Sequence, residues 1–121
     1  MENSHESVVT CLDGASSNDS PDEVDREVAE LLSLLGKKHS LALLAQFAAD
    51  SGPWRFSELD DELGISPNAL STRLSEFEDI GLVTRQSYDE NPPRVEYVAT
   101  EDAEDLRPIF QQLYEWGERR C

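Results

Sequence analysis

Apolar residues recur every three or four positions in several segments of the chain, which is the spacing of one buried face on an α-helix. Helices are therefore predicted at residues 21–35, 38–50, 58–63, 67–80 and 101–117. Gly, Pro and Ser residues fall between these segments and favour breaks in the chain there. The pattern thus indicates five separate helices, of which the third is short.

The inward faces of the helices follow from the same spacing. In the fourth helix, Leu70, Leu74 and Phe77 form a core stripe that Ile80 completes. In the second helix, the predicted inward face consists of Leu41, Leu44, Ala45 and Ala48.

Polar residues before the helices predict where they begin. Ser66 is followed by Pro67, the combination of an N-cap and a proline in the first helical position. Ser57 and Thr100 are the cap candidates of the short third helix and of the last helix. Pro108 lies inside the last helix, where it removes a backbone hydrogen bond, so we expect a kink there.

Two runs of alternating residues, 82–88 and 94–99, are joined by a turn that contains two prolines, so they predict a β-hairpin. Residues 54–56 alternate as well and are long enough only for a minimal strand. Helices 58–63 and 67–80 meet at a tight turn, and together they predict a helix-turn-helix that the hairpin follows as a wing. We expect a mainly α winged helix over 22–121, after a disordered acidic tail at 1–21.

The numbers of acidic and basic residues indicate the salt conditions in which the protein acts. The chain has 26 acidic and 10 basic residues, a net charge of −16, and its only lysines are Lys37 and Lys38. Acids spread along the whole chain, with so little lysine, are typical of proteins in molar salt, where charge repulsion is screened. We expect a halophilic, haloarchaeal source; the alternative is an ordinary acidic protein. Without an apolar run or a signal segment, the protein is expected to be soluble and cytoplasmic.

One helix stands apart from this acidity, because no acid occurs between Gly64 and Ser75. With the core stripe inward, its outward face is small, neutral and able to form hydrogen bonds, and it consists of Asn68, Ser71, Thr72 and Ser75. Such a face suits the base edges and phosphates of a major groove, where a carboxylate would be repelled. The plainer interpretation is an ordinary polar surface, although the chain elsewhere fills such positions with Asp and Glu.

Basic residues give further candidate phosphate contacts. Lys37 and Lys38 lie at the start of the second helix, and Arg94 lies near the tip of the wing. Arg85 either contacts DNA or pairs with Glu96 across the hairpin. Arg73 flanks the core stripe, so it either reaches a phosphate or holds the short helix by pairing with one of its acids, Glu58, Asp61 or Glu62.

The sequence does not predict a catalytic site or a metal-binding site. His5 and His39 have no partners at a catalytic or metal-ligand spacing, and Cys11 and Cys121 lie near opposite ends of the chain. We expect no catalysis, no metal and no cofactor. The cysteines are either two free thiols or a redox switch.

Three stretches of the chain resemble the HxlR family of winged helix-turn-helix regulators, which are relatives of the MarR proteins. They are LLGKKHSLALLAQF, then GPWRFSELDDELGISPNALSTRLSEFEDIGLVTRQSYDENPPRVEYVATE, then LYEWG. The PPRVEY wing is the most specific part. His39 stands where the family often has Trp, and Arg26 stands where several members have a sensing Cys.

The resemblance implies a homodimeric transcriptional regulator that binds a palindromic operator in double-stranded DNA. It places near DNA the residues Lys38, Ser66, Pro67, Asn68, Ser71, Thr72, Arg73 and Arg94, to which we add Lys37 and Ser75. It places the dimer interface on the first and last helices, at Val28, Leu31, Leu106, Ile109, Phe110, Leu113, Tyr114 and Trp116. A small-molecule or redox signal would control it. The rival interpretation is a winged-helix module that binds another protein.

Overall fold

The computed structural model describes residues 21–121, and the predicted tail, with His5 and Cys11, lies outside the described residues apart from Pro21. The described chain divides into two units, one ending at Gly36 and one spanning Lys37–Cys121. In the first unit, helix α2 (Pro21–Leu35) begins at the predicted proline. Val28 and Leu32 are exposed on α2, and Leu31 is half-buried.

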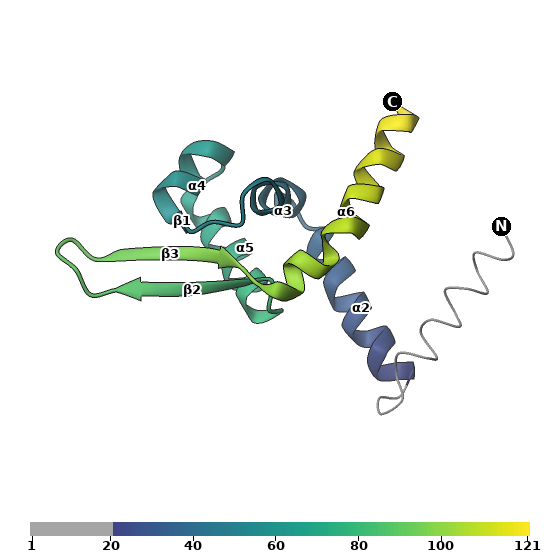
Figure 1. The fold of residues 1–121 in the computed structure, drawn as a ribbon, viewed down its shortest axis with the longest axis horizontal. Helices are drawn as coiled ribbons and strands as arrows, with labels where there is room; N and C mark the ends of the chain where they lie inside the picture. Colours follow the sequence, from purple (N-terminus) through teal and green to yellow (C-terminus); the bar gives the residue numbers. More distant parts are fainter. Residues whose placement is uncertain (1–20) are drawn as a thin grey trace, which may run out of the picture. The chain divides into compact units, whose positions relative to one another are not determined.

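The second unit is a winged helix. Its helices are α3 (Ser40–Ala49), α4 (Phe56–Leu63), α5 (Pro67–Asp79) and α6 (Glu101–Arg120), and its strands are β1 (Trp54–Arg55), β2 (Val83–Tyr88) and β3 (Arg94–Ala99). The strands form one antiparallel sheet in the order β1-β3-β2, which confirms both the hairpin and the minimal strand. Figure 1 shows the β2–β3 hairpin projecting beyond the helices of this unit, as a wing does.

Tyr97 lies at the centre of the sheet, because it is paired with Trp54 on one side and with Arg85 on the other. The register places Gln86, not Arg85, opposite Glu96. The alternative that Arg85 pairs with Glu96 directly across the hairpin is therefore wrong in register. Gly52 lies where a side chain would meet the Tyr97 carbonyl oxygen at 2.8 Å, and its φ of +104° also favours glycine.

The core of the second unit gathers the predicted stripe of α5 with residues from every neighbouring element. Leu70, Leu74 and Phe77 are fully buried, as predicted. On α3 the prediction was right for Leu44, which is buried, and wrong for Leu41 and Ala45, which are exposed. Leu43 and Phe47 are buried in their place. Nearly every position of α3 is apolar, so two stripes had helical spacing, and the stripe with the bulkier Phe47 is the buried one.

The helix ends follow local hydrogen bonding. Ser66 and Thr100 cap α5 and α6 as predicted, each accepting a backbone N–H at 3.2 Å. Ser57 is not the cap of α4, because β1 runs directly into a helix that begins at Phe56, and Glu58 Oε1 accepts the Arg55 N–H at 2.8 Å. Gly64, with φ of +63°, ends α4 as predicted.

Helix α6 is longer than predicted and continues through Gly117 to Arg120. Two arginines in its last turn lie where the negative end of the helix dipole favours cations. Pro108 lies inside the helix, and Figure 1 shows the axis changing direction between the first turns and the rest, as the expected kink requires.

Candidate nucleic-acid interface

The buried residues of α5 determine which of its residues face outward. Leu70, Leu74 and Phe77 are at most 1% exposed, which fixes the rotation of the helix. The opposite side therefore faces solvent, and the residues exposed there are Pro67, Asn68, Ser71, Thr72 and Ser75. The first turn contains no acid. The face offers hydroxyl and amide groups that donate and accept hydrogen bonds, without a carboxylate among them.

Arg73 points to the segment before α3, not to the acids of α4. Its Nε donates to the backbone carbonyl of Lys38 at 2.9 Å, and its guanidinium pairs with Glu76 on the same helix. Its side chain is 19% exposed. Arg73 thus ties α5 to residues 37–39, where His39 has a left-handed φ of 73°.

Glu76 is the centre of this cluster, because it accepts a second cation. Lys37 Nζ lies 2.5 Å from Glu76 Oε2. The hydrogen bond from Lys37, and then those of Arg73, hold the pKa of the Glu76 carboxyl below its ordinary value of 4.5, against the opposing effect of burial. Of the two lysines, Lys38 has no ion pair among the described residues, so its ammonium is free for another partner.

Arg94, the predicted cation of the wing, is held by its own strand and turn. Its guanidinium lies 3.3 Å from Glu90 and 3.5 Å from Glu96, and it stacks over the Tyr88 ring at 4.4 Å. The Nε atom is buried and forms no hydrogen bond of good geometry. The structure therefore presents Arg94 at the wing, with its charge partly neutralised.

Sequence reasoning missed Arg55. It lies at the junction of β1 and α4 and is exposed, and its guanidinium forms no ion pair within 4 Å in the described part of the chain. A signal was present, because residues 51–57 form another acid-free window, the same feature that singled out α5.

The predicted dimer residues differ in their exposure. Ile109, Leu113, Tyr114 and Trp116 are each about half exposed on α6, which is unusual for large apolar side chains. Leu106 is half-buried, and Phe110 is only 5% exposed. Phe110 thus already belongs to the core of its own chain, so it would support an interface from below more than contact a partner directly.

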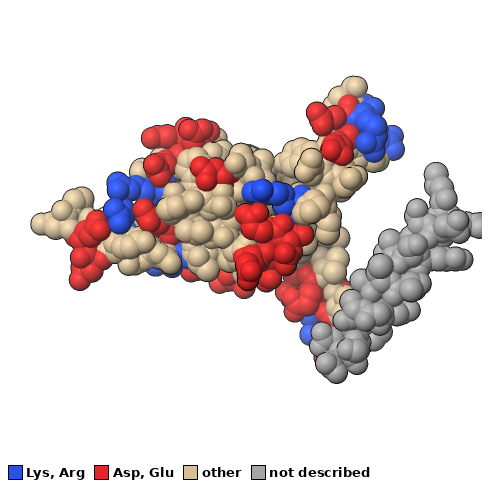
Figure 2. All heavy atoms as spheres, viewed as in Figure 1, with Lys and Arg blue, Asp and Glu red and all other residues tan. Residues whose placement is uncertain are grey.

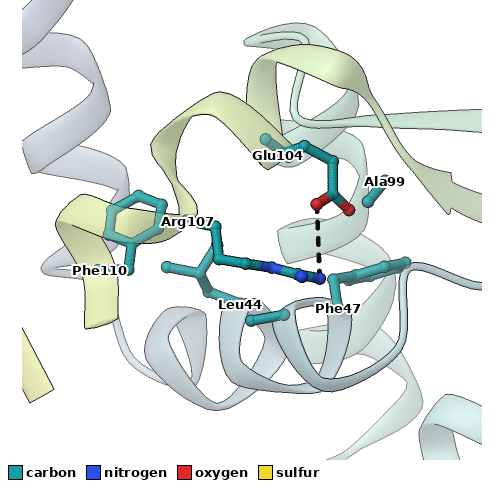
Figure 3. Close-up of a pocket in the computed structure, with 8 residues that line it drawn as sticks. Leu44, Phe47, Ala99, Glu104, Arg107 and Phe110 are labelled. Carbon is teal, nitrogen blue, oxygen red and sulfur yellow. Dashed lines mark ion pairs between the residues drawn. The ribbon is translucent and has the colours of Figure 1, made fainter.

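A small cavity lies where α6 meets α3. Figure 3 shows Leu44 and Phe47 of α3 and Phe110 of α6 around this cavity, with Arg107 extending across it below Glu104, its ion-pair partner at 3.5 Å. Its volume of about 20 Å³ holds one water molecule at most. The cavity is a packing defect of this junction rather than a site for a metabolite.

The described residues 21–121 contain no group of three or more His, Cys, Asp or Glu side chains placed to hold a metal ion. None of their helices is long and apolar enough to cross a membrane.

Residues 34–121, which include all of the second unit, match the family model described as HxlR-like helix-turn-helix. The chain belongs to the HxlR-like family. It is a DNA-binding transcriptional regulator, and this confirms the function that the α5 face and the wing predicted.

Relatives of this HxlR-like protein carry regulator names. It is 44% identical over 87 residues to an uncharacterised HTH-type transcriptional regulator of Halalkalibacterium halodurans, covering 71% of this chain and 76% of that one. Among solved structures it resembles the reduced form of the transcriptional regulator YodB from B. subtilis, with TM-score 0.64, 36% identity and coverage of 75% and 88%. It also resembles the redox regulator HypR in its reduced form, with TM-score 0.66, 35% identity and coverage of 76% and 90%.

Proposed function

We propose that this HxlR-like protein acts as a homodimer on a palindromic operator, with α5 of each protomer in a major groove and the wing on adjacent backbone or in the minor groove. The observation that carries the proposal is the neutral face of α5. Asn68, Ser71 and Thr72 are exposed on it together with Ser75, and all four precede the acids at the end of the helix. Ser66 and Pro67 fix the start of the helix, so its first turn would approach the bases.

Because the rest of the chain is acidic, the neutral face of α5 is a strong indication of where DNA would bind. A dimer carries twice −16, or −32, so long-range electrostatics oppose the approach of DNA. A contact surface on such a protein has to be locally clear of carboxylates, and salt has to screen the remainder. Lys38, Lys37, Arg73 and Arg94 would add phosphate contacts at its edges, some of them by exchanging an internal carboxylate for a phosphate.

The dimer is supported by apolar area that a single chain leaves in water. Four large side chains of α6, Ile109, Leu113, Tyr114 and Trp116, are about half exposed, and Val28 is 45% exposed on α2. Burial of such side chains between two protomers is favourable at roughly 25 cal/mol per Å² of apolar area. On α6, Leu106 and Phe110 are more buried and would support this surface from within; on α2, Leu31 is half-buried.

The proposal includes the setting and the signal. The net charge and the scarcity of lysine support a halophilic, haloarchaeal source. Membership of a family of helix-turn-helix regulators, whose partner is DNA, supports a cytoplasmic location. A redox signal is supported by the likeness to HypR, which is named a redox regulator, and by the exposed free thiol of Cys121. Treatment with diamide, which oxidises thiols, should change DNA binding of the native protein and not of the Cys11→Ser/Cys121→Ser variant; equal responses would exclude a thiol signal.

The test of the main proposal is fluorescence anisotropy with a duplex from upstream of the protein's own gene, at about 0.2 M and at molar KCl. The native protein is compared with Asn68→Glu/Thr72→Glu and with a control, Gln111→Glu/Gln112→Glu, which adds the same charge on α6. Loss of binding in the α5 variant alone supports the groove contact. Equal binding of both variants would contradict it.

A further inference from the structure

A groove lies between the start of α4 and the turn of the wing. Its volume is about 460 Å³, and the residues on its α4 side include Arg55 and Ser57. The opposite wall comes from the wing and includes Glu90, Pro93 and Arg94. The groove thus brings together two arginines that are 39 positions apart in the sequence. Figure 2 shows blue side chains gathered where the hairpin meets β1 and α4, with red ones beside them on the hairpin.

The two arginines differ in their partners. Arg55 is exposed, and its guanidinium forms no ion pair within 4 Å among the described residues. Its backbone is nevertheless fixed, because it pairs with Glu96 in the sheet and its N–H donates to Glu58 at 2.8 Å. The exposed guanidinium therefore extends from a fixed point of the backbone and has no ion pair of its own among the described residues, so it is available to an anionic partner from outside.

Arg94 faces the same groove with a partner that it can exchange. Glu90, at 3.3 Å, is half exposed and lies in the turn, so this ion pair is weak. The Tyr88 ring, at 4.4 Å, and Glu96, at 3.5 Å, also contact the Arg94 guanidinium. Replacing Glu90 by another anion would leave the position of the guanidinium unchanged.

We propose that this groove binds a phosphate of the operator backbone, with Arg55 as its main ligand and Arg94 as a second ligand released from Glu90. The inference rests on the proposed function and adds to it a contact that lies outside α5. The first helix of a helix-turn-helix crosses the DNA backbone, which places the start of α4 beside phosphates. The planar donor groups of arginine match two phosphate oxygens. The Ser57 hydroxyl, also exposed, lies at hand as a further donor.

The test compares Arg55→Gln with Arg119→Gln by anisotropy on the operator duplex. Both variants lose one positive charge from an exposed arginine, but Arg119 lies in the last turn of α6. Arg55→Gln should bind roughly tenfold more weakly, which is the effect of one charge-assisted contact. The slope of log affinity against log salt should also change by about 0.9, the value for one phosphate. Arg119→Gln should match the native protein in both.

A series of duplexes, each with one uncharged methylphosphonate, then locates the phosphate. The native protein should lose affinity at one position in each half-site, and Arg55→Gln should show no further loss there. Glu90→Gln, which releases Arg94, should bind two- to fivefold more tightly than its neighbour control Asp89→Asn. Circular dichroism of each variant verifies that it is folded.

The outcomes separate this inference from the proposed function. If Arg55→Gln binds like Arg119→Gln while the α5 variant does not bind, the groove contact is wrong and the α5 contact stands. If Arg55→Gln is weaker but remains as sensitive as the native protein to every methylphosphonate, its effect is long-range charge and the inference is also wrong. If the native protein binds no duplex at any salt, both proposals fall.

Discussion

Glu76→Gln is the substitution that best tests the cluster joining α5 to the segment before α3. In the native chain Glu76 Oε2 accepts a hydrogen bond from Lys37 Nζ at 2.5 Å, and the Glu76 carboxylate also pairs with Arg73. Arg73 Nε in turn donates to the backbone carbonyl of Lys38 at 2.9 Å. Glutamine has nearly the same shape and keeps one acceptor oxygen, but it has no charge. The substitution therefore removes the electrostatic part of both ion pairs and leaves the packing in place.

The expected loss of unfolding free energy is about 1 kcal/mol. Each exposed ion pair contributes roughly 0.2–1 kcal/mol, and Lys37, at 44% exposed, belongs at the lower end of that range. Arg73 is only 19% exposed, so its pair belongs at the upper end. Removal of any acid also relieves repulsion in a chain of net charge −16, which acts in the opposite direction. Glu78, on the same helix, forms no ion pair with any described residue, so Glu78→Gln measures that second effect alone.

The difference should depend on pH with a definite sign. The folded protein holds the pKa of Glu76 below its ordinary value of 4.5, so the carboxylate contributes stability at pH values above 4.5. That contribution disappears as the pH falls through the lowered pKa, because a protonated Glu76 resembles glutamine. The native protein and Glu76→Gln should therefore converge in stability in strong acid.

The assay is urea unfolding followed by the fluorescence of Trp54 and Trp116, at a fixed protein concentration because a dimer would make stability depend on concentration. It is run at neutral pH and near pH 3. A Glu76→Gln protein as stable at neutral pH as Glu78→Gln would refute the role of the cluster. A difference of undiminished size at low pH would refute the electrostatic explanation.

Three other predictions concern the cap of α6, the dimer and the effect of salt on stability. Thr100→Ala, which loses the cap of α6 and the 2.6 Å hydrogen bond to the Gly81 carbonyl, should lower the unfolding free energy by roughly 1 kcal/mol; in urea unfolding, Thr100→Ser should keep most of it. Leu113→Glu should yield a monomer by light scattering where the native protein is a dimer, and an unchanged mass would contradict an α6 interface. The melting temperature should rise from about 0.2 M to molar KCl; a flat profile would contradict a halophilic origin.

The sequence predicted best those features that depend on neighbouring residues. Ser66 and Thr100 cap their helices because a hydroxyl three residues before a free N–H is sufficient for the bond. The hairpin strands were predicted to within one residue, since alternation ends where the prolines of the turn begin. Ser57 failed as a cap because the competing bond, from the Arg55 N–H to Glu58, shifts the start of α4.

Features that depend on tertiary contacts were harder to predict from the sequence. The buried face of α3 could not be chosen by periodicity, because both candidate faces are apolar, and only the neighbours of Phe47 decide. The partner of Arg73 was sought among the acids of α4, but the acceptors are Glu76 and the Lys38 carbonyl, 35 positions away. No local sequence pattern predicts a hydrogen bond between a side chain and a distant backbone carbonyl.

The ion pairs of this unit bear on how an acidic protein binds DNA at high salt. Ordinarily DNA binding weakens steeply with salt, because each phosphate contact releases a counterion from the DNA. Where Lys37, Arg73 or Arg94 contacts a phosphate, it leaves a carboxylate of its own chain, and that carboxylate then takes up a cation from solution. Release and uptake oppose each other, so these contacts add little to the salt slope. Only the unpaired cations, Lys38 and Arg55 among them, would contribute in full, and binding should therefore weaken only gradually as salt rises.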